Sequence, residues 1–184
     1  KASAFIQHEG SSGYAERQEG PHAHSVTFDA SGKYLVVADL GIDKLAIYRY
    51  DVGTGALKAI DTPAVLKPGA GPRHTKFHPK LPVIYSVNEL DSTVTAFAFD
   101  VASGATKELQ TITTLPSKFV GMNTTAEIRV HPSGQFMYAS NRGHDSIAVF
   151  GVERASGKLS AKGQTSTGGS TPRNFNVEPS GKYL

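Results

Sequence analysis

The sequence contains a unit of about 50 residues that occurs three times in full and begins a fourth time. Four anchor residues mark the same place in each unit, and they are spaced 49, 53 and 47 residues apart: Phe28, Phe77, Val130 and Val177. A later glycine of each complete unit gives the spacings 49 and 53 again: Gly55, Gly104 and Gly157. Two independent markers therefore define one period, which predicts a repeat architecture.

Each unit consists of short runs rich in Val, Ile, Thr, Tyr and Phe, separated by turns of Gly, Pro, Ser and Asp. Such runs are typical of β-strands, and no sustained helical period is present. Residues 109–114 and 159–165 supply a fourth run to their units. Four antiparallel strands in every unit predict an all-β fold of β-propeller blades. A β-sandwich also has many short strands, but it does not repeat the sequence of each four-strand block.

Composition excludes several classes of protein. The 184 residues contain no Cys, which excludes disulfide scaffolds and Cys-ligated metal sites. The net charge of +3 comes from 19 basic and 16 acidic side chains without a long run of like charge, so nucleic acid and membrane surfaces are not expected partners. Apolar runs such as residues 35–38 are far too short for a membrane helix. We expect a cytoplasmic protein.

Unusual polar residues collect at equivalent positions of the units. At the start of the first strands stand His24, Arg73, Ala126 and Arg173, followed directly by Ser25, His74, Glu127 and Asn174. At the ends of the second strands stand Asp39, Glu89 and Arg142, the last two preceded by Asn88 and Asn141. In a blade these two ends lie at the same mouth of the central channel, because the first two strands form a hairpin. We therefore expect a functional cluster at one mouth.

The residue types in this cluster favour binding and hydrolysis of an anionic ester or lactone. Guanidinium groups bind phosphate or carboxylate in two-pronged fashion, and a His beside a carboxylate offers a general base and acid. The alternative is that these side chains are simply solvated or pair with one another across blades. The predicted catalytic set is His24, Arg73, Glu89 and Arg142. The predicted substrate-binding set is His22, His74, Asn88, Glu127, Asn141 and Arg173.

Metal and cofactor sites are not expected. His22 and His24 are two residues apart and could share one face of a strand, but no further ligands stand at a recognisable spacing. His78 and His131 precede Pro in predicted hairpin turns, where we expect them to have a turn role.

Several segments together resemble the 6-phosphogluconolactonase family of seven-bladed propellers, which includes a fungal muconate-lactonizing enzyme. They are Gln7-His-Glu-Gly10, Gly20-Pro-His-Ala-His24, Gly71-Pro-Arg-His74, Val87-Asn-Glu-Leu90, Ile128-Arg-Val-His-Pro132, Ser140-Asn-Arg-Gly143 and Thr171-Pro-Arg-Asn-Phe175. The resemblance implies a lactonase with its pocket in the central cleft. It also implies an active-site set of His24 (with His22 as the near alternative), Arg73, Glu89 and Arg142.

The resemblance implies hydrolysis of a small phosphorylated or carboxylated lactone, with 6-phosphogluconolactone of the pentose phosphate pathway as the expected substrate. Glu89 or His24 would deprotonate a water, while Arg73 and Arg142 would hold the anion and stabilise the developing oxyanion. Two alternatives stay open. The same residues could serve a muconate-type cycloisomerase, or the propeller could be a non-catalytic binding platform.

The length fits about half of such a ring, because seven blades of about 50 residues need about 350 residues. We expect blades over residues 21–70, 71–122 and 123–170, and the start of a further blade over 171–184. Residues 1–20 are predicted to be the connection and outer strand of an incomplete blade, with the strand at Lys1 to Gln7. The missing half of the propeller, or a second chain, would close the ring.

Overall fold

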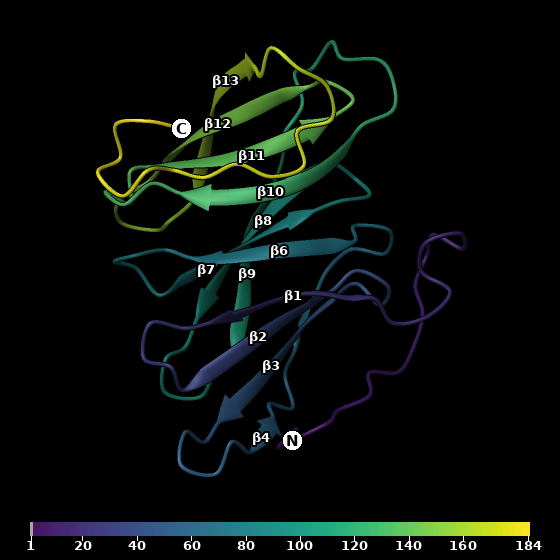
Figure 1. Cartoon of the computed structure of the whole chain (residues 1–184), viewed down its shortest axis with the longest axis vertical. Coiled ribbons are helices and arrows are strands. Elements are labelled where there is room, and N and C mark those ends of the chain that lie inside the picture. Colours follow the sequence, from purple (N-terminus) through teal and green to yellow (C-terminus); the bar gives the residue numbers. More distant parts are fainter. Residues whose placement is uncertain (1) are drawn as a thin grey trace.

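The computed structural model describes residues 2–184 as three antiparallel β-sheets (Figure 1). The first sheet contains β1 (Ala23–Phe28), β2 (Tyr34–Asp39), β3 (Lys44–Tyr50), β4 (Leu57–Ala59) and β5 (Ala64–Val65). The second contains β6 (Pro72–Phe77), β7 (Val83–Asn88), β8 (Thr93–Phe99) and β9 (Thr106–Thr113). The third contains β10 (Thr124–Val130), β11 (Phe136–Arg142), β12 (Ser146–Val152) and β13 (Leu159–Ser166). The prediction of an all-β fold with four-stranded antiparallel units is confirmed.

In each sheet the strands pair in the order of the sequence. The first sheet differs only at its outer edge, where β4 and β5 both pair with β3 and together take the place of one fourth strand. The break falls around Pro63, which has no N–H group to donate to the ladder. Nowhere in residues 2–184 is there a helix of the length and apolarity that a membrane span needs.

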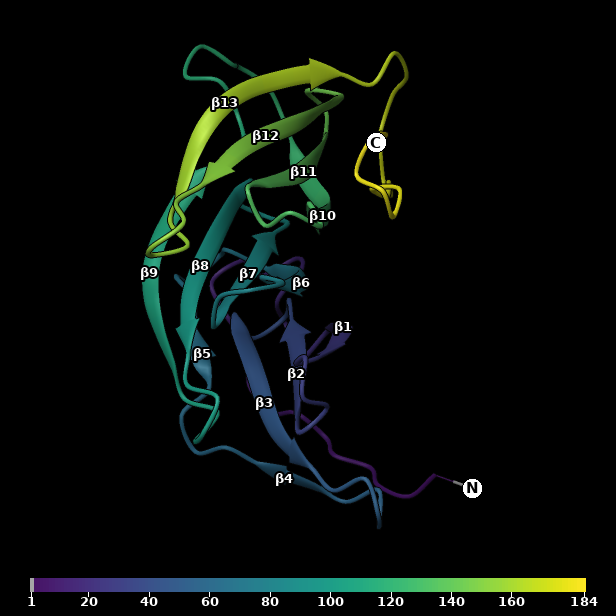
Figure 2. The same ribbon diagram turned by 90° about the vertical axis from the view of Figure 1, so that its left-hand side faces the viewer.

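The three sheets follow one another along an arc, as Figure 2 shows. Outer strands β9 and β13 lie along one side of the arc, and the first strands β1, β6 and β10 lie along the other. Across the blades β6 neighbours both β1 and β10. One apolar core lies between the first two sheets and a second lies between the last two. The first strands are thus brought side by side along the inner surface of the arc.

Equivalent hydrogen bonds join successive blades. The hydroxyl of Tyr34 donates to the carbonyl of Ala102 at 2.7 Å, and that of Tyr85 donates to the carbonyl of Gly157 at 2.7 Å. Both tyrosines are almost completely buried. Because a buried hydroxyl group needs a partner, these bonds hold each blade at a fixed position on the next.

The histidines of the hairpin turns have the predicted turn role, since His78 Nδ1 accepts from Lys80 N and Leu81 N, and His131 Nδ1 accepts from Ser133 N. Each also bonds the next blade. His78 Nε2 bonds the carbonyl of Gly134 at 2.8 Å, and His131 Nε2 bonds that of Gly181 at 3.0 Å. Each of these two glycines has a positive φ, and an added Cβ would lie within 2.6 Å of the histidine ring. Only glycine fits there, for conformational and steric reasons together.

The terminal segments differ in part from the predictions. The outer strand expected over residues 1–7 is not formed in the described part, since residues 2–22 contain no strand and Lys1 lies outside it. A strand needs a partner strand for its backbone groups, and the ladders of residues 2–184 provide none for this segment. Residues 171–184 form no strand either, but they do form the expected hairpin turn. Glu178 N donates to Tyr183 O at 3.0 Å, as Asp29 N does to Tyr34 O in the first blade.

Candidate functional site

A β-bulge lies at the same place in the first strand of every blade. The pairing with the second strand shifts between Ala23 and Ser25, between Pro72 and His74, and between Thr125 and Ile128. The extra residue is His24 in the first blade and Arg73 in the second, while the third blade carries Ala126 and Glu127 there. Bulges re-aim side chains that regular alternation would place on one face. The sequence signal for the cluster therefore coincides with a repeated irregularity of the backbone.

The carboxylate of Glu89 is the centre of the cluster, and three arginines contact it. Arg73 Nε donates to Oε2 at 2.7 Å, Arg142 Nη2 lies 3.1 Å from the same oxygen, and Arg17 Nη2 donates to Oε1 at 2.8 Å. The side chains of Arg73 and Glu89 are 3% and 6% exposed. Three guanidinium groups against one carboxylate leave an excess of two positive charges at this point.

Burial and the three arginines together determine the protonation state of Glu89. Burial alone would raise the pKa of its carboxyl group, but the hydrogen bond from Arg17 and the charges of Arg142, Arg17 and Arg73 outweigh burial and lower the pKa. A carboxylate that is ionised and already holds three cations is a poor proton acceptor. The geometry therefore favours a positioning role for Glu89 over that of a general base.

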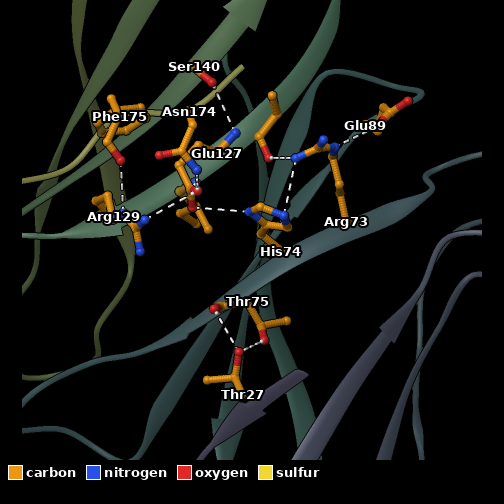
Figure 3. Close-up of polar contacts among 12 residues, drawn as sticks. Thr27, Arg73, His74, Thr75, Glu89, Glu127, Arg129, Ser140, Asn174 and Phe175 are labelled. Atoms are coloured by element: carbon orange, nitrogen blue, oxygen red, sulfur yellow. Dashed lines mark hydrogen bonds and ion pairs between the residues drawn. The ribbon is translucent and has the colours of Figure 1, made fainter. Parts of the chain in front are cut away.

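His74 connects this group to a second acidic residue (Figure 3). Its Nε2 lies 3.2 Å from Arg73 Nη1, and its Nδ1 lies 3.1 Å from Glu127 Oε1. A guanidinium group only donates, so Nε2 must accept, and the ring proton must sit on Nδ1, facing Glu127. His74 thus links Arg73 of the second blade to Glu127 of the third.

Glu127 is 2% exposed and binds several donors. Besides His74, it accepts from Asn174 Nδ2 at 2.6 Å and from Ile128 N at 3.0 Å, and Arg129 Nη2 lies 3.4 Å from Oε2. Asn174 belongs to the fourth unit, so this contact ties the C-terminal segment to β10. The second acidic residue is thus surrounded by donors, as Glu89 is.

His24 lies beside His74 at the solvent-exposed rim of the cluster. The centroids of the two imidazole rings are 5.1 Å apart. The pKa of His24 is lowered to about 4. The largest cause is partial burial, and the second is the positive charge of Arg73. At neutral pH its imidazole is therefore uncharged, although it is a weaker base than an ordinary imidazole.

The structure separates His22 from this group. His22 Nε2 lies 3.1 Å from Glu19 Oε1, and both side chains are largely exposed. Its backbone N–H donates to Asp39 Oδ1 at 2.7 Å. The side chain of His24, not that of His22, has a close contact to the Arg73 and Glu89 group through His74.

Asn88 and Asn141 lie behind the cluster, where their amides bind their own blades. Both residues are fully buried. Asn88 Nδ2 donates to the hydroxyls of Thr93 and Thr95, and Asn141 Nδ2 donates to Thr114 O and Ser146 Oγ. With their N–H groups engaged in this way, neither amide has a donor left for a substrate. Asn88 and Asn141 therefore support the strand ends, and the substrate contact that we expected of them does not fit this geometry.

Arg142 and Arg173 occupy different environments. Arg142 Nη2 donates to Thr125 O at 2.9 Å, and its buried Nε has no hydrogen-bond partner among residues 2–184. Arg173 is exposed on the C-terminal segment. Burial is the largest cause that lowers the pKa of Arg73, and the charge of Arg173 lowers this pKa further. Arg142 joins the buried group, and Arg173 lies nearer the solvent.

Arg17 is the contact that the sequence analysis missed. It lies in a segment without a counterpart in the other units, and 72 residues separate it from Glu89. The spacing of the repeated units therefore does not predict a contact between Arg17 and Glu89. A weak signal was the presence of an isolated Arg in a Gly- and Ser-rich connection before the first blade.

The comparisons with known proteins agree with this architecture. The family described as "Lactonase, 7-bladed beta-propeller" matches residues 1–184. A protein of Bacillus subtilis named 6-phosphogluconolactonase is 41% identical over 169 residues, which are 92% of this chain and 48% of that protein. An otherwise similar protein of Lactococcus lactis, 38% identical over 97% of this chain and 51% of its own length, is described as uncharacterized.

Solved structures show the same relation. A Lactobacillus plantarum protein superimposes with a TM-score of 0.89 and 34% identity, over 96% of this chain and 50% of that one. The structure described as periplasmic gluconolactonase from Pseudomonas aeruginosa gives a TM-score of 0.86 with 33% identity, over 95% and 49%. The chain therefore spans about half the length of the relatives it matches.

Proposed function

Since the chain belongs to the lactonase family with a seven-bladed β-propeller fold, we propose that the protein hydrolyses a sugar lactone, with 6-phosphogluconolactone as its substrate. The observation that carries this proposal is the buried carboxylate of Glu89 with Arg73, Arg142 and Arg17 around it. The excess positive charge favours an anionic substrate and stabilises an oxyanion. A relative that covers the chain at 41% identity carries the same activity in its name.

The proposed base is His24, because it is uncharged at neutral pH and lies at the rim where water enters. It takes a proton from a water molecule, whose oxygen attacks the lactone carbonyl carbon. Arg73 and Arg142 stabilise the tetrahedral oxyanion. When the bond between this carbon and the ring oxygen breaks, the ring oxygen receives the proton from the imidazolium of His24. The product is the open hydroxy acid, which releases its acid proton to solvent.

In this mechanism Glu89 and His74 position the reacting groups. Glu89 fixes the orientation of two guanidinium groups through the bonds to Oε2. His74 accepts from Arg73 and touches the ring of His24, which places the base next to the oxyanion site. Groups held in this way need no reorganisation as charge develops in the transition state.

The direct test measures turnover by the intact protein of 6-phosphogluconolactone, unphosphorylated glucono-lactone and a muconate-type unsaturated dicarboxylate. We expect hydrolysis of the phosphorylated lactone well above the spontaneous rate, which is followed in parallel without protein. Turnover of the dicarboxylate alone would assign a cycloisomerase instead. Absence of turnover on all three substrates would contradict an enzymatic role and favour a binding platform.

We further propose that additional blades, from the same protein or a second chain, close the ring. On the first sheet Leu35, Val37 and Tyr48 form an apolar cluster away from the core between blades, and Val26 and Phe28 are 61% and 49% exposed. Such edges and faces favour association when they are left open. Light scattering on the 184-residue chain should show a mass above 19.5 kDa. A monodisperse monomer of that mass would argue against the proposal.

A further inference from the structure

The segment before the first blade is held in place by contacts that do not involve the side chain of Arg17. Ser12 Oγ donates to Asp43 Oδ2 at 2.5 Å. Gln18 is fully buried, donates through Nε2 to Leu40 O at 2.8 Å and accepts from Tyr14 N at 2.9 Å. Figure 1 shows this purple N-terminal segment running beside the first sheet before it enters β1. We refer to residues 10–20 as the strap.

The strap carries one arginine to the cluster, and this arginine is the most accessible of the three that contact Glu89. The side chain of Arg17 is 46% exposed, compared with 11% for Arg142 and 3% for Arg73. Arg17 uses Nη2 for Glu89, whereas Arg73 uses Nε for Glu89 and Nη1 for Ala126 O. The remainder of the Arg17 guanidinium group is therefore in contact with solvent above the buried pair.

The cluster extends from the buried pair of Arg73 and Glu89 to the exposed side chain of Arg17. A lactone carbonyl that reaches Arg73 and Arg142 enters the buried part of the cluster. Arg17 contacts the other oxygen of the same Glu89 carboxylate, so its guanidinium group lies next to this position and nearer the solvent. An exposed guanidinium group with free N–H groups can bind a phosphate or carboxylate there in two-pronged fashion.

The inference that follows rests on the proposed function. We infer that Arg17 is a specificity-determining residue, which binds the anionic group that the substrate carries away from its lactone ring. Its contact with Glu89 at 2.8 Å orients the guanidinium group before the substrate arrives. The strap thus adds to the mouth of the first two blades a recognition element that the repeated units do not contain.

The test compares Arg17→Ala and Arg17→Lys in the intact protein on three lactones. These are 6-phosphogluconolactone, a glucaro-lactone that carries a carboxylate instead, and uncharged glucono-lactone. We expect Arg17→Ala to lower kcat/KM for the anionic lactones by about tenfold or more beyond its effect on glucono-lactone. The two anionic arms show whether phosphate or carboxylate is recognised. Arg17→Lys keeps a point charge and should restore part of the loss.

Arg154→Ala is the matched control, because Arg154 is exposed and lies on the third blade, remote from the strap. It should leave all three rates unchanged. An equal loss on charged and uncharged lactones would overturn the inference, because Arg17 would then act only by orienting Glu89. Unchanged rates in Arg17→Ala would overturn it as well.

Calorimetric titration with 6-phosphogluconate and gluconate separates this inference from the proposed function. If the wild-type protein hydrolyses none of the lactones, the proposed function fails, but the titration still decides the role of Arg17. A weaker affinity of Arg17→Ala for 6-phosphogluconate, with the affinity for gluconate unchanged, would support the inference. Equal affinities of variant and wild type for 6-phosphogluconate, or no binding by the wild type, would overturn it.

Discussion

Replacing His24 with alanine is expected to lower kcat/KM for lactone hydrolysis about 100-fold or more, the range that a general base contributes. The same change at His22 should have an effect below about threefold, since removal of an exposed side chain outside the reacting group has little influence. The difference arises because His24 adjoins His74 and the buried arginines, whereas His22 faces Glu19. The measurement is the initial rate of both variants beside the wild type, at saturating and at low lactone concentration.

The pH dependence provides an independent check of the same base. Because the pKa of His24 is lowered to about 4, protonation removes the base only when the pH falls toward that value. The kcat/KM of the wild type should therefore stay constant from neutral pH down to about pH 5 and decrease below it. An ordinary imidazole would lose activity near pH 6.5. A midpoint near 6.5, or equal losses in the two histidine variants, would contradict the assignment of His24.

Changing Glu89 to glutamine is expected to lower the free energy of unfolding by about 3 to 5 kcal/mol, because it leaves a buried charge without its partner. Arg73 is 2% exposed and would retain its charge next to Arg142 with no carboxylate between them. Lactone hydrolysis should fall about 100-fold in the same variant, as the guanidinium groups lose their fixed orientation. Urea unfolding and the lactone assay measure the two effects separately.

Two further variants make this prediction specific. Glu16→Gln removes an exposed carboxylate from the strap and should change the free energy of unfolding by less than about 0.5 kcal/mol. The double variant Arg73→Met and Glu89→Leu removes the most buried charge pair and should recover part of the stability, because Arg142 still keeps its charge without the carboxylate. It should not recover activity. Wild-type stability in Glu89→Gln would show that the carboxylate does not hold the arginines together. Recovery of activity in the double variant would exclude both residues from the mechanism.

The all-β fold was predictable because its cause is local and repeated. Strand residues such as those of β2 and β7 alternate with turn residues at a spacing of about 50, and each unit can bury its apolar faces only against its neighbours. The same register placed Arg73, Glu89 and Arg142 at one mouth, and the structure brings these three side chains into contact. Asn88 and Asn141 shared that register, yet each is buried behind the mouth.

Register failed at the asparagines because it assigns a residue to the end of a strand without stating which face the side chain takes. A bulge of one residue at His24 or Arg73 redirects the side chain there, and no residue type in the sequence predicts such a bulge. The outer strand expected over residues 1–7 is not formed by residues 2–7 for a related reason. Strand formation depends on a partner strand, which local composition does not reveal.

The sequence by itself determined the repeated four-stranded unit, the order of the blades and the common position of Arg73, Glu89 and Arg142. Each of these follows from periodicity along the chain. Only the tertiary structure decided that Glu89 holds three arginines, that His74 links Arg73 to Glu127, and that Arg17 belongs to the site. All but the contact between Arg73 and His74 join side chains 16 to 72 residues apart, and the energies of these contacts arise from burial and charge in three dimensions.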